Sequence, residues 1–246
     1  MNAIEAFSRH AHTYEDHATV QKRVAHRLLE CLPSSAQIRE ILELGCGTGH
    51  FSDLVLQKHP TAHMTLLDPS EAMLEQVRRR PWSSQVNLIQ TCAEQYRPEG
   101  PQDLIVSSSA AQWFSHPIKD LKRYQQFLRP GGTLAFSVYV EGTLQEWNEC
   151  VRESCKRHGL AAPAHQGLLS IARWQNWSDL RCFTETHTLL YPDAFQALKA
   201  IQRTGAAGSD VQLPAHVMRE AIRIYGSRYP EGVPVTYQVF YGKVQK

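Results

Sequence analysis

The stretch that decides the fold is Ile41-Leu42-Glu43-Leu44-Gly45-Cys46-Gly47-Thr48-Gly49, in which a mainly apolar run enters a loop with three glycines. This pattern is typical of a buried strand that turns into a helix. A second apolar run, His63–Leu67, ends at Asp68. Strand, glycine loop, helix, strand and acid together predict a nucleotide-cofactor site, because glycines let the backbone approach a ligand and an acid binds ribose hydroxyls.

The glycine spacing and the preceding acid indicate which nucleotide. Gly45, Gly47 and Gly49 follow the pattern G-x-G-x-G, whereas a dinucleotide fingerprint has G-x-G-x-x-G with the pyrophosphate at the helix N-terminus. Glu43 would repel a pyrophosphate and suits a cofactor that is positively charged there. S-Adenosylmethionine carries an ammonium and a sulfonium group, so we predict this cofactor and a methyltransferase. A plain turn at the loop and a helix cap at Asp68-Pro69-Ser70 are the alternatives for each feature alone.

Length and composition are those of one globular α/β domain or two small ones. The chain has 246 residues, of which 42% are hydrophobic and 20% charged, and a formal net charge of +2. That charge is far from the basic balance of a dedicated nucleic-acid binder. No apolar run approaches the ~20 residues that span a bilayer. Residues 1–10 lack the apolar core of a signal peptide, so a cytoplasmic protein is expected.

The cysteines show no metal or redox motif. No C-x-x-C pair occurs, so free, largely buried thiols are expected. Cys150 and Cys155 are close to His158, but a separation of five residues turns the two thiols ~140° apart on a helix. The six cysteines are Cys31, Cys46, Cys92, Cys150, Cys155 and Cys182.

Strands that alternate with helices predict a parallel sheet with right-handed crossovers. After a polar, helix-prone segment at 3–31, we expect strands at 40–44, 63–67, 86–90, 104–107, 133–139, 183–190 and 233–241. The expected helices cover 49–58, 70–80, 118–128, 141–158, 174–180, 192–203 and 214–226. Arg129-Pro130-Gly131-Gly132 is expected to stop a helix and form a tight turn.

These elements predict an α/β, Rossmann-like class I methyltransferase with a seven-stranded, mostly parallel sheet in one domain, 1–246. Residues 36–140 would form the cofactor-binding core and residues 1–35 an N-terminal helical cover. Residues 141–226 would supply a helical lid, and 227–246 the last strand. Ligands bind beyond the carboxyl ends of such strands, so the cover and the lid are expected over the site.

The cofactor contacts are expected where the first four strands end. Glu43 would meet the methionine ammonium, Asp68 the ribose hydroxyls, and Met73 the adenine ring. An acid after the third strand usually accepts from the adenine amino group in this class of enzymes. Cys92, a weak hydrogen-bonding group, stands there instead, so the next two backbone amides are the alternative. The expected set is Glu43, Gly45, Cys46, Gly47, Gly49, Asp68, Met73, Cys92, Ala93, Glu94 and Ser109.

Several stretches together resemble one known family from about residue 5 to residue 242. They are Phe7–Ala18, Ala111-Gln112-Trp113-Phe114, Leu134–Ser137, Gly142-Thr143, Arg203-Thr204-Gly205-Ala206 and Thr236–Gly242. The family is the malonyl-acyl-carrier-protein O-methyltransferases of biotin synthesis. Gln112-Trp113 and Arg203-Thr204-Gly205 are the more specific parts, since the glycine loop marks only the broad methyltransferase class. Cys92 in place of the usual acid and Ser108-Ser109 in place of a Ser-Asn pair depart from the family pattern.

The resemblance implies that S-adenosylmethionine methylates the free carboxylate of a malonyl thioester. A carboxylic acid with a pKa near ~4 is ionised at neutral pH, so no catalytic acid or base is expected. The rate would come from aligning oxygen, methyl carbon and sulfur, which can supply ~7–11 kcal/mol. Tyr14, Gln112, Trp113 and Arg203 are the expected substrate-binding residues, with Arg203 pairing with the carboxylate. A core role for Trp113 and a surface role for Arg203 are the alternatives.

The resemblance also implies an acidic acyl-carrier protein, or malonyl-coenzyme A, as partner, without nucleic acid, membrane or metal. A basic docking face would suit an acidic carrier. Arg78-Arg79-Arg80 indicates only a solvated helix face. The candidate clusters are Arg152, Lys156 and Arg157 on one helix and Arg219 and Arg223 on another.

Three other functions fit parts of the pattern. A small-acid or quinone methyltransferase of the same fold is one, although a quinone phenol requires a base and an apolar pocket. A non-catalytic module that binds S-adenosylmethionine is another, and Cys92 favours it slightly. A nucleic-acid methyltransferase is disfavoured, because Ser107-Ser108-Ser109-Ala110 stands where an N/D-P-P-Y/F motif would be expected.

Overall fold

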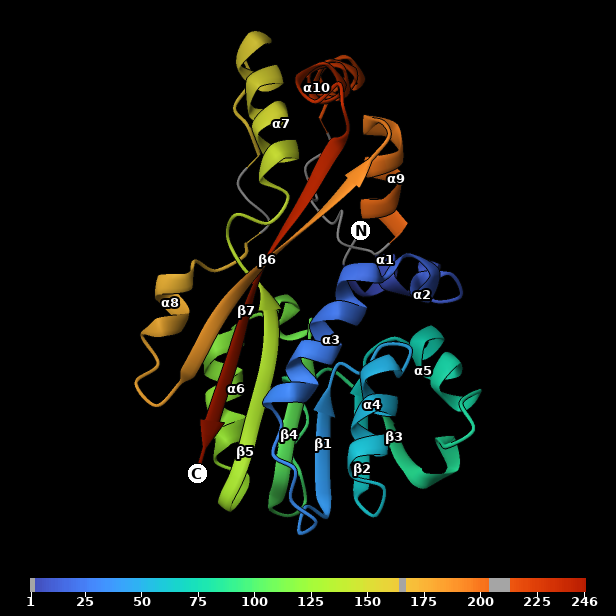
Figure 1. Ribbon diagram of the computed structural model, residues 1–246, viewed down its shortest axis with the longest axis vertical. Coiled ribbons are helices and arrows are strands. Elements are labelled where there is room, and N and C mark those ends of the chain that lie inside the picture. The colour runs from blue at the N-terminus through green and yellow to red at the C-terminus, as the bar shows by residue number, and fades with distance from the viewer. Residues whose placement is uncertain (1–2, 164–166, 204–212) are drawn as a thin grey trace.

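A seven-stranded sheet organises the protein, which the computed structural model describes over residues 3–163, 167–203 and 213–246 (Figure 1). The strands are β1 (Glu40–Leu44), β2 (His63–Asp68), β3 (Val86–Gln90), β4 (Gln102–Ser108), β5 (Leu128–Tyr139), β6 (Arg181–Tyr191) and β7 (Val233–Gln245). Across the sheet their order is β3-β2-β1-β4-β5-β7-β6. β1 to β5 pair in parallel, and β7 runs antiparallel to both β5 and β6. The predicted seven-stranded, mostly parallel sheet is confirmed.

The strand order reverses between β1 and β4. β2 and β3 lie on one side of β1, whereas β4 and β5 lie on the other. The connections that leave β1 and β4 therefore run in opposite directions across the sheet. In open parallel sheets, this reversal opens a crevice beyond the carboxyl ends of the strands, where ligands bind.

Helices cover both faces of the sheet and its carboxyl end (Figure 1). They are α1 (Ala3–His10), α2 (Tyr14–His17), α3 (Thr19–Cys31), α4 (His50–Lys58), α5 (Glu71–Arg78), α6 (Pro117–Gln125), α7 (Gln145–Arg157), α8 (Ile171–Gln175), α9 (Ala194–Arg203) and α10 (Ala215–Arg228), with 3₁₀ turns η1 (Ser83–Gln85) and η2 (Ala111–Trp113). α1 and α2 lie above the carboxyl ends of the parallel strands, and α7, α9 and α10 lie at the same end of the molecule. No helix in the described ranges is long and apolar enough to cross a membrane.

The core has two layers because successive side chains of a strand point to opposite faces of the sheet. In β1, Ile41 packs in the cluster formed with α3 and α4, while Leu42 and Leu44 pack in the cluster formed with α6. Glu43 therefore faces the α3 and α4 side, and its side chain is 1% exposed. The strand pattern alone thus places a carboxyl group inside the protein, next to the glycine loop.

Two local predictions were wrong, and distant contacts explain both. The expected turn at 129–132 lies within β5, which begins at Leu128 with a bulge opposite β4, because Gly131 N donates to the carbonyl of Lys246 at 2.6 Å. The expected helix at 174–180 is instead α8, which ends at Gln175. Here Trp174 and Trp177 are both buried against Phe136, with ring centroids 5.2 and 6.1 Å away.

Candidate functional site

A cavity of about 200 Å³ lies beyond the carboxyl ends of β1, β2 and β4, where the strand order reverses. α1, α2 and α3 contribute its outer wall, and the loops after the strands contribute its inner wall. Gly49 is absent from the wall, unlike the other residues predicted to bind the cofactor. Those in the wall are Glu43, Gly45, Cys46, Gly47, Asp68, Met73, Cys92, Ala93, Glu94 and Ser109.

Two of the three loop glycines, Gly45 and Gly49, pass too close to their neighbours for a side chain. Gly45 has φ +74°, and a Cβ there would lie 2.5 Å from the Cβ of Ala110. The loop is held to β2 because the N–H groups of Gly45 and Cys46 both donate to the carbonyl of Leu67, at 2.8 and 2.9 Å. Gly49 starts α4 with φ +81° and packs against Trp82, which is why it lies outside the cavity wall. The structure thus provides backbone that a ligand can approach closely.

Asp68 joins the loop and the next helix. Its Oδ2 accepts from Gly47 N and its Oδ1 from Ser70 N, both at 2.9 Å. The cap of α5 within Asp68-Pro69-Ser70 is Ser70, whose Oγ accepts from Met73 N at 3.3 Å, and Asp68 holds this cap residue through its N–H. Each oxygen of Asp68 retains a lone pair for a ligand in the cavity. Burial raises the pKa of Asp68 to about 6, although both N–H donors oppose the shift. A cation or hydroxyl donor in the cavity would therefore stabilise the ionised acid.

Glu43 is the second buried acid in the wall. Its Oε2 accepts from Ser52 Oγ at 2.6 Å. Burial raises the pKa of Glu43 to about 8, and the charge of Asp68 adds to the shift. Two buried acids side by side would repel a pyrophosphate and stabilise a positively charged ligand. The residues present therefore fit S-adenosylmethionine.

The loop after β4 is strained and polar. Ser109 has φ +53°, which is costly for a residue other than glycine, and its buried Oγ has no partner in the described part of the chain. Gln112 Nε2 donates to the Ser109 carbonyl at 2.7 Å. Gln112 is thus absent from the cavity wall and holds a residue that belongs to it, whereas Trp113 lines the cavity directly.

The N-terminal helices close the cavity from outside. Phe7 contacts Trp113 edge to face, with ring centroids 5.5 Å apart, and also contacts Tyr14. Tyr14 lines the cavity, and burial raises the pKa of its hydroxyl, which stays protonated and able to donate. Ser8 Oγ lies 2.7 Å from Ser70 Oγ, and this hydrogen bond attaches α1 to the start of α5.

Arg80 corrects the expectation of a solvated basic run. It is half-buried, donates to the carbonyl of Thr48 at 3.2 Å and forms an ion pair with Glu15. Glu15 also accepts from Thr48 Oγ1 at 2.7 Å. Arg80 thus ties α2 to the glycine loop, while Arg78 follows the expectation and pairs with Glu71 near the surface.

Arg203 lies beside the cover and not in the cavity wall. It is the last residue of α9, and its Nη1 lies 3.1 Å from His17 Nε2 on α2. His17 is one helical turn from Tyr14, so α9 contacts the helix that carries the predicted substrate residue. Thr204-Gly205-Ala206, which belongs to the same predicted motif, lies outside the described residues.

Lys22 is a cavity residue that the sequence reasoning missed. Among the described residues of the wall, it is the only lysine or arginine. The available signal was the spacing on α3, where Ala18, Gln21, Lys22 and Ala25 share one helix face. The small alanines on either side of Lys22 leave room between α3 and the loops below.

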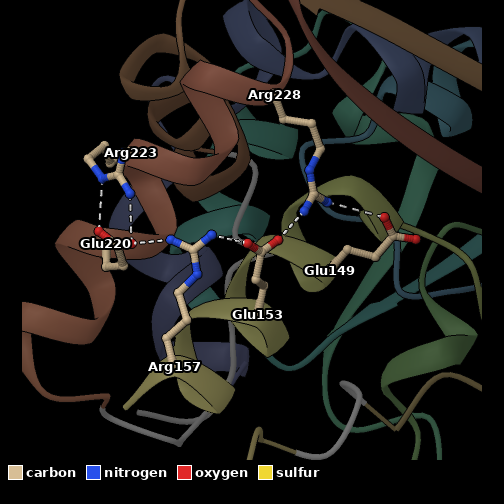
Figure 2. Close-up of polar contacts among 6 residues, drawn as sticks. All are labelled: Glu149, Glu153, Arg157, Glu220, Arg223 and Arg228. Carbon is tan, nitrogen blue, oxygen red and sulfur yellow. Dashed lines mark hydrogen bonds and ion pairs between the residues drawn. The ribbon is translucent and has the colours of Figure 1, made fainter.

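Arg157 and Arg223, two of the five basic residues proposed as a docking face, are paired with acids. Figure 2 shows a chain of ion pairs between α7 and α10. Arg157 contacts Glu153 and lies 2.7 Å from Glu220, and Arg223 lies 2.8 Å from Glu220. The chain consists of Glu149, Glu153, Arg157, Glu220, Arg223 and Arg228. Arg157 and Arg228 therefore join the two helices. Arg157 and Arg223, both paired with acids, present little uncompensated charge to an acidic partner.

Cys150 and Cys155, the two cysteines of α7, lie in different clusters. Cys150 belongs to the large core cluster that includes β7, whereas Cys155 packs with Val217 and Ala221 of α10. All six cysteines are free thiols. Over residues 3–163, 167–203 and 213–246, no group of three His, Cys, Asp or Glu side chains is placed to hold a metal ion.

A Rossmann-like sheet with an acidic, glycine-lined cavity at its switch point defines the protein as an S-adenosylmethionine-dependent methyltransferase. A family profile described as "Methyltransferase domain" matches residues 16–205. The malonyl-[acyl-carrier protein] O-methyltransferase of Brevibacillus brevis is 30% identical over 96% of this chain and 92% of its own length. That of Priestia megaterium is 29% identical over 98% of this chain and 95% of its own length.

The chain therefore belongs to the methyltransferase family, in the group of the malonyl-[acyl-carrier protein] O-methyltransferases. The solved structure of YcgJ from Bacillus subtilis has the same fold, with a TM-score of 0.59 and 16% identity over 90% of this chain and 98% of that one. The predicted enzyme class and cofactor are confirmed.

Proposed function

We propose that this methyltransferase esterifies the free carboxylate of a malonyl thioester carried by an acyl-carrier protein. The observation that carries the proposal is the division of the cavity. Buried acids that suit a cationic donor come from β1 and β2, whereas Ser109 and Trp113 come from the loop after β4. Neither of these two side chains takes up a proton at neutral pH, and an already ionised carboxylate does not require a base. The names of the full-length relatives support this substrate.

The bound donor would supply an electrophilic methyl group, and the chain would orient and shield it. We assign the adenine to the region of Met73, Cys92 and Ala93, because these residues line the cavity beside β3. Asp68 would accept from the ribose hydroxyls, and Glu43 would face the ammonium. Phe7 and Trp113 would exclude water from the methyl group, since the ring of Phe7 in the cover contacts the ring of Trp113 in the loop after β4.

The substrate carboxylate would enter between α2 and the loop after β4. The protonated Tyr14 hydroxyl would donate to one carboxylate oxygen, which leaves the other free to attack in line with the methyl carbon and sulfur. Binding must remain moderate, because a tightly held anion is a weaker nucleophile. Gln112 and Arg203 would act through neighbours: Gln112 holds Ser109, and Arg203 holds His17 on the helix of Tyr14.

The proposal also divides the single domain by role. Residues 1–35 cover the cavity, 36–140 bind the cofactor, 141–226 frame the substrate entrance and 227–246 complete the sheet. Within the first segment, α1 and α2 supply cavity residues, which supports the role of a cover. An acidic carrier protein would approach this end of the molecule.

Intact-mass spectrometry of carrier proteins tests the substrate. With S-adenosylmethionine, the protein should add one methyl group to malonyl-carrier protein and none to acetyl-carrier protein, which lacks the carboxylate. Malonyl-coenzyme A as a third substrate tests the carrier itself. Absence of transfer to malonyl-carrier protein, with donor binding verified by calorimetry, would overturn the assignment and favour another small-acid substrate.

A further inference from the structure

One end of the cavity carries a positive charge that no other group neutralises. Lys22 is half-buried on α3, and its Nζ has no hydrogen-bond or ion-pair partner within residues 3–163, 167–203 and 213–246. Two other half-buried lysines have hydrogen-bond acceptors for their ammonium groups: Lys58 Nζ donates to two carbonyls at 2.9 Å, and Lys243 Nζ donates to one at 3.0 Å. The nearby acid Glu15 is already engaged by Arg80. Lys22 is therefore available to an anion in the cavity.

The N-terminus of α4 lies at the same end. Its N-cap residue is Gly49, and no side chain caps the helix. His50, the first residue of α4, lines the cavity, and its buried Nε2 has no partner in the described part of the chain. Burial lowers the pKa of His50; the charge of Glu15 opposes the shift, and the charges of Lys22, His26 and Arg80 add to it. A cation, an uncapped helix N-terminus and a neutral imidazole together form an anion subsite.

The order of groups along the cavity identifies the anion. If the adenine lies by Ala93 and the ribose by Asp68, the rest of the donor must pass the glycine loop toward α3 and α4. The methionine part ends in an ammonium and a carboxylate. Glu43 suits the first, and Lys22 suits the second.

We propose that Lys22, assisted by His50 and the N-terminus of α4, binds the α-carboxylate of the methionine part of S-adenosylmethionine. Lys22 is then a cofactor-binding residue and takes no part in methyl transfer itself. This assignment rests on the donor orientation given under the proposed function. The substrate carboxylate is the rival anion, but the proposed function places it between α2 and the loop after β4, and not at the N-terminus of α4.

The test compares two ligands that differ only in this carboxylate. Calorimetry would measure the Kd of S-adenosylhomocysteine and of its decarboxylated analogue for wild type, Lys22→Met, Lys22→Arg and the control Arg23→Met. Arg23 is exposed and does not line the cavity. Wild type and Arg23→Met should prefer the carboxylated ligand by ~10–100-fold, the range for a hydrogen bond to a charged group. In Lys22→Met the preference should fall to within about threefold, and Lys22→Arg should keep most of it.

Three results would overturn the assignment of Lys22, and each has a different consequence. Equal weakening of both ligands by Lys22→Met would mean that Lys22 shapes the cavity without recognising the carboxylate. An unchanged preference with a raised KM for malonyl-carrier protein would assign Lys22 to the substrate. Failure of wild type to bind S-adenosylhomocysteine would overturn the donor orientation itself. Thermal unfolding of each variant identifies any loss of fold.

Discussion

Asp68 Oδ2 accepts a hydrogen bond from Gly47 N at 2.9 Å, which joins the acid at the end of β2 to the glycine loop after β1. Two roles that the sequence left as alternatives therefore belong to one carboxylate. One lone pair of Oδ2 orders the loop and one of Oδ1 binds the start of α5, and the remaining lone pairs can accept from ribose hydroxyls. The loop is shaped for the cofactor by a residue that would also bind it.

Asp68→Asn should separate these two roles. The amide keeps the size of the acid but loses its charge and one of its two acceptor oxygens. We expect the Kd for S-adenosylmethionine to rise ~10–100-fold, the range for a lost charge-assisted hydrogen bond. Calorimetry would measure the change. Glu94→Gln, which also neutralises an acid of the cavity wall, is the matched control and should have a much smaller effect. Equal effects of the two variants would contradict a specific role for Asp68.

Donor binding should depend on pH because of Glu43. Its pKa is about 8 in the ligand-free protein, so the acid is mostly protonated at neutral pH. A bound cation favours the ionised form, and binding therefore releases a proton. From about pH 6 to about pH 7.5, the affinity should rise by up to about tenfold per pH unit. Calorimetry in two buffers of different ionisation enthalpy would detect the proton, and Glu43→Gln should abolish this release.

In the ligand-free protein, a rise in pH should lower the free energy of unfolding because of Glu43. Its pKa is raised by folding from 4.5 to about 8, so the folded state binds more protons than the unfolded state in this interval. The contribution of Glu43 to stability is therefore complete below pH 4.5 and is lost as the pH rises through about 8. Urea unfolding at several pH values should show a flatter profile for Glu43→Gln than for wild type. Parallel profiles would mean that Glu43 is already ionised in the folded protein.

Phe7 should affect activity because its ring helps to hold the N-terminal cover over the cavity. Its ring contacts Trp113 at 5.5 Å, and removing the contact should loosen α1 over the cavity. Aromatic pairs contribute ~0.5–1.5 kcal/mol beyond burial, so Phe7→Ala should lower kcat/KM by about 3–10-fold. Phe195→Ala removes a ring that is 68% exposed on α9 and serves as control in the same kinetic assay. An equal loss of kcat/KM in both variants would mean that activity does not depend on the contact between Phe7 and Trp113.

Arg203 should affect the substrate more than the donor. Arg203→Ala removes the contact with His17 on the helix of Tyr14, and we expect the KM for malonyl-carrier protein to rise about 3–10-fold. The Kd for S-adenosylmethionine should stay near wild type. Lys199→Ala, one turn earlier on α9 and exposed, is the control. An unchanged kcat/KM for Arg203→Ala would remove this residue from the mechanism.

Local sequence predicted the parts of the fold that depend on local chemistry. β1 and β3 begin and end at the predicted residues. β1 is buried at four of its five positions, and a buried parallel strand requires a largely apolar run. Glu43 and Asp68 lie in the predicted cavity for the same reason, since each is at or near the end of such a strand. The turn predicted around Gly131 was wrong because β7, more than 100 residues later, pairs with this segment.

The remaining site residues depend on contacts between distant segments. Lys22 is an ordinary helix residue until α3 is placed against α4, and no local pattern gives that placement. Gln112 carries a family motif, but only the fold shows that it holds the Ser109 carbonyl. The basic residue Arg157 was a candidate for docking because its acidic partner Glu220 becomes a neighbour only when α7 packs on α10, whereas Arg223 has Glu220 three residues earlier on its own helix.

The position of the transferred methyl group tests the central claim most directly. The protein would be incubated with malonyl-carrier protein and donor labelled with carbon-13 at the methyl group, and the acyl group would be released and fragmented in a tandem mass spectrometer. We predict that the label resides on the terminal carboxyl oxygen as a methyl ester, and that mild alkali removes it as methanol. A label on carbon, on the thioester sulfur or on the carrier polypeptide would contradict the assignment of the malonyl carboxylate as nucleophile.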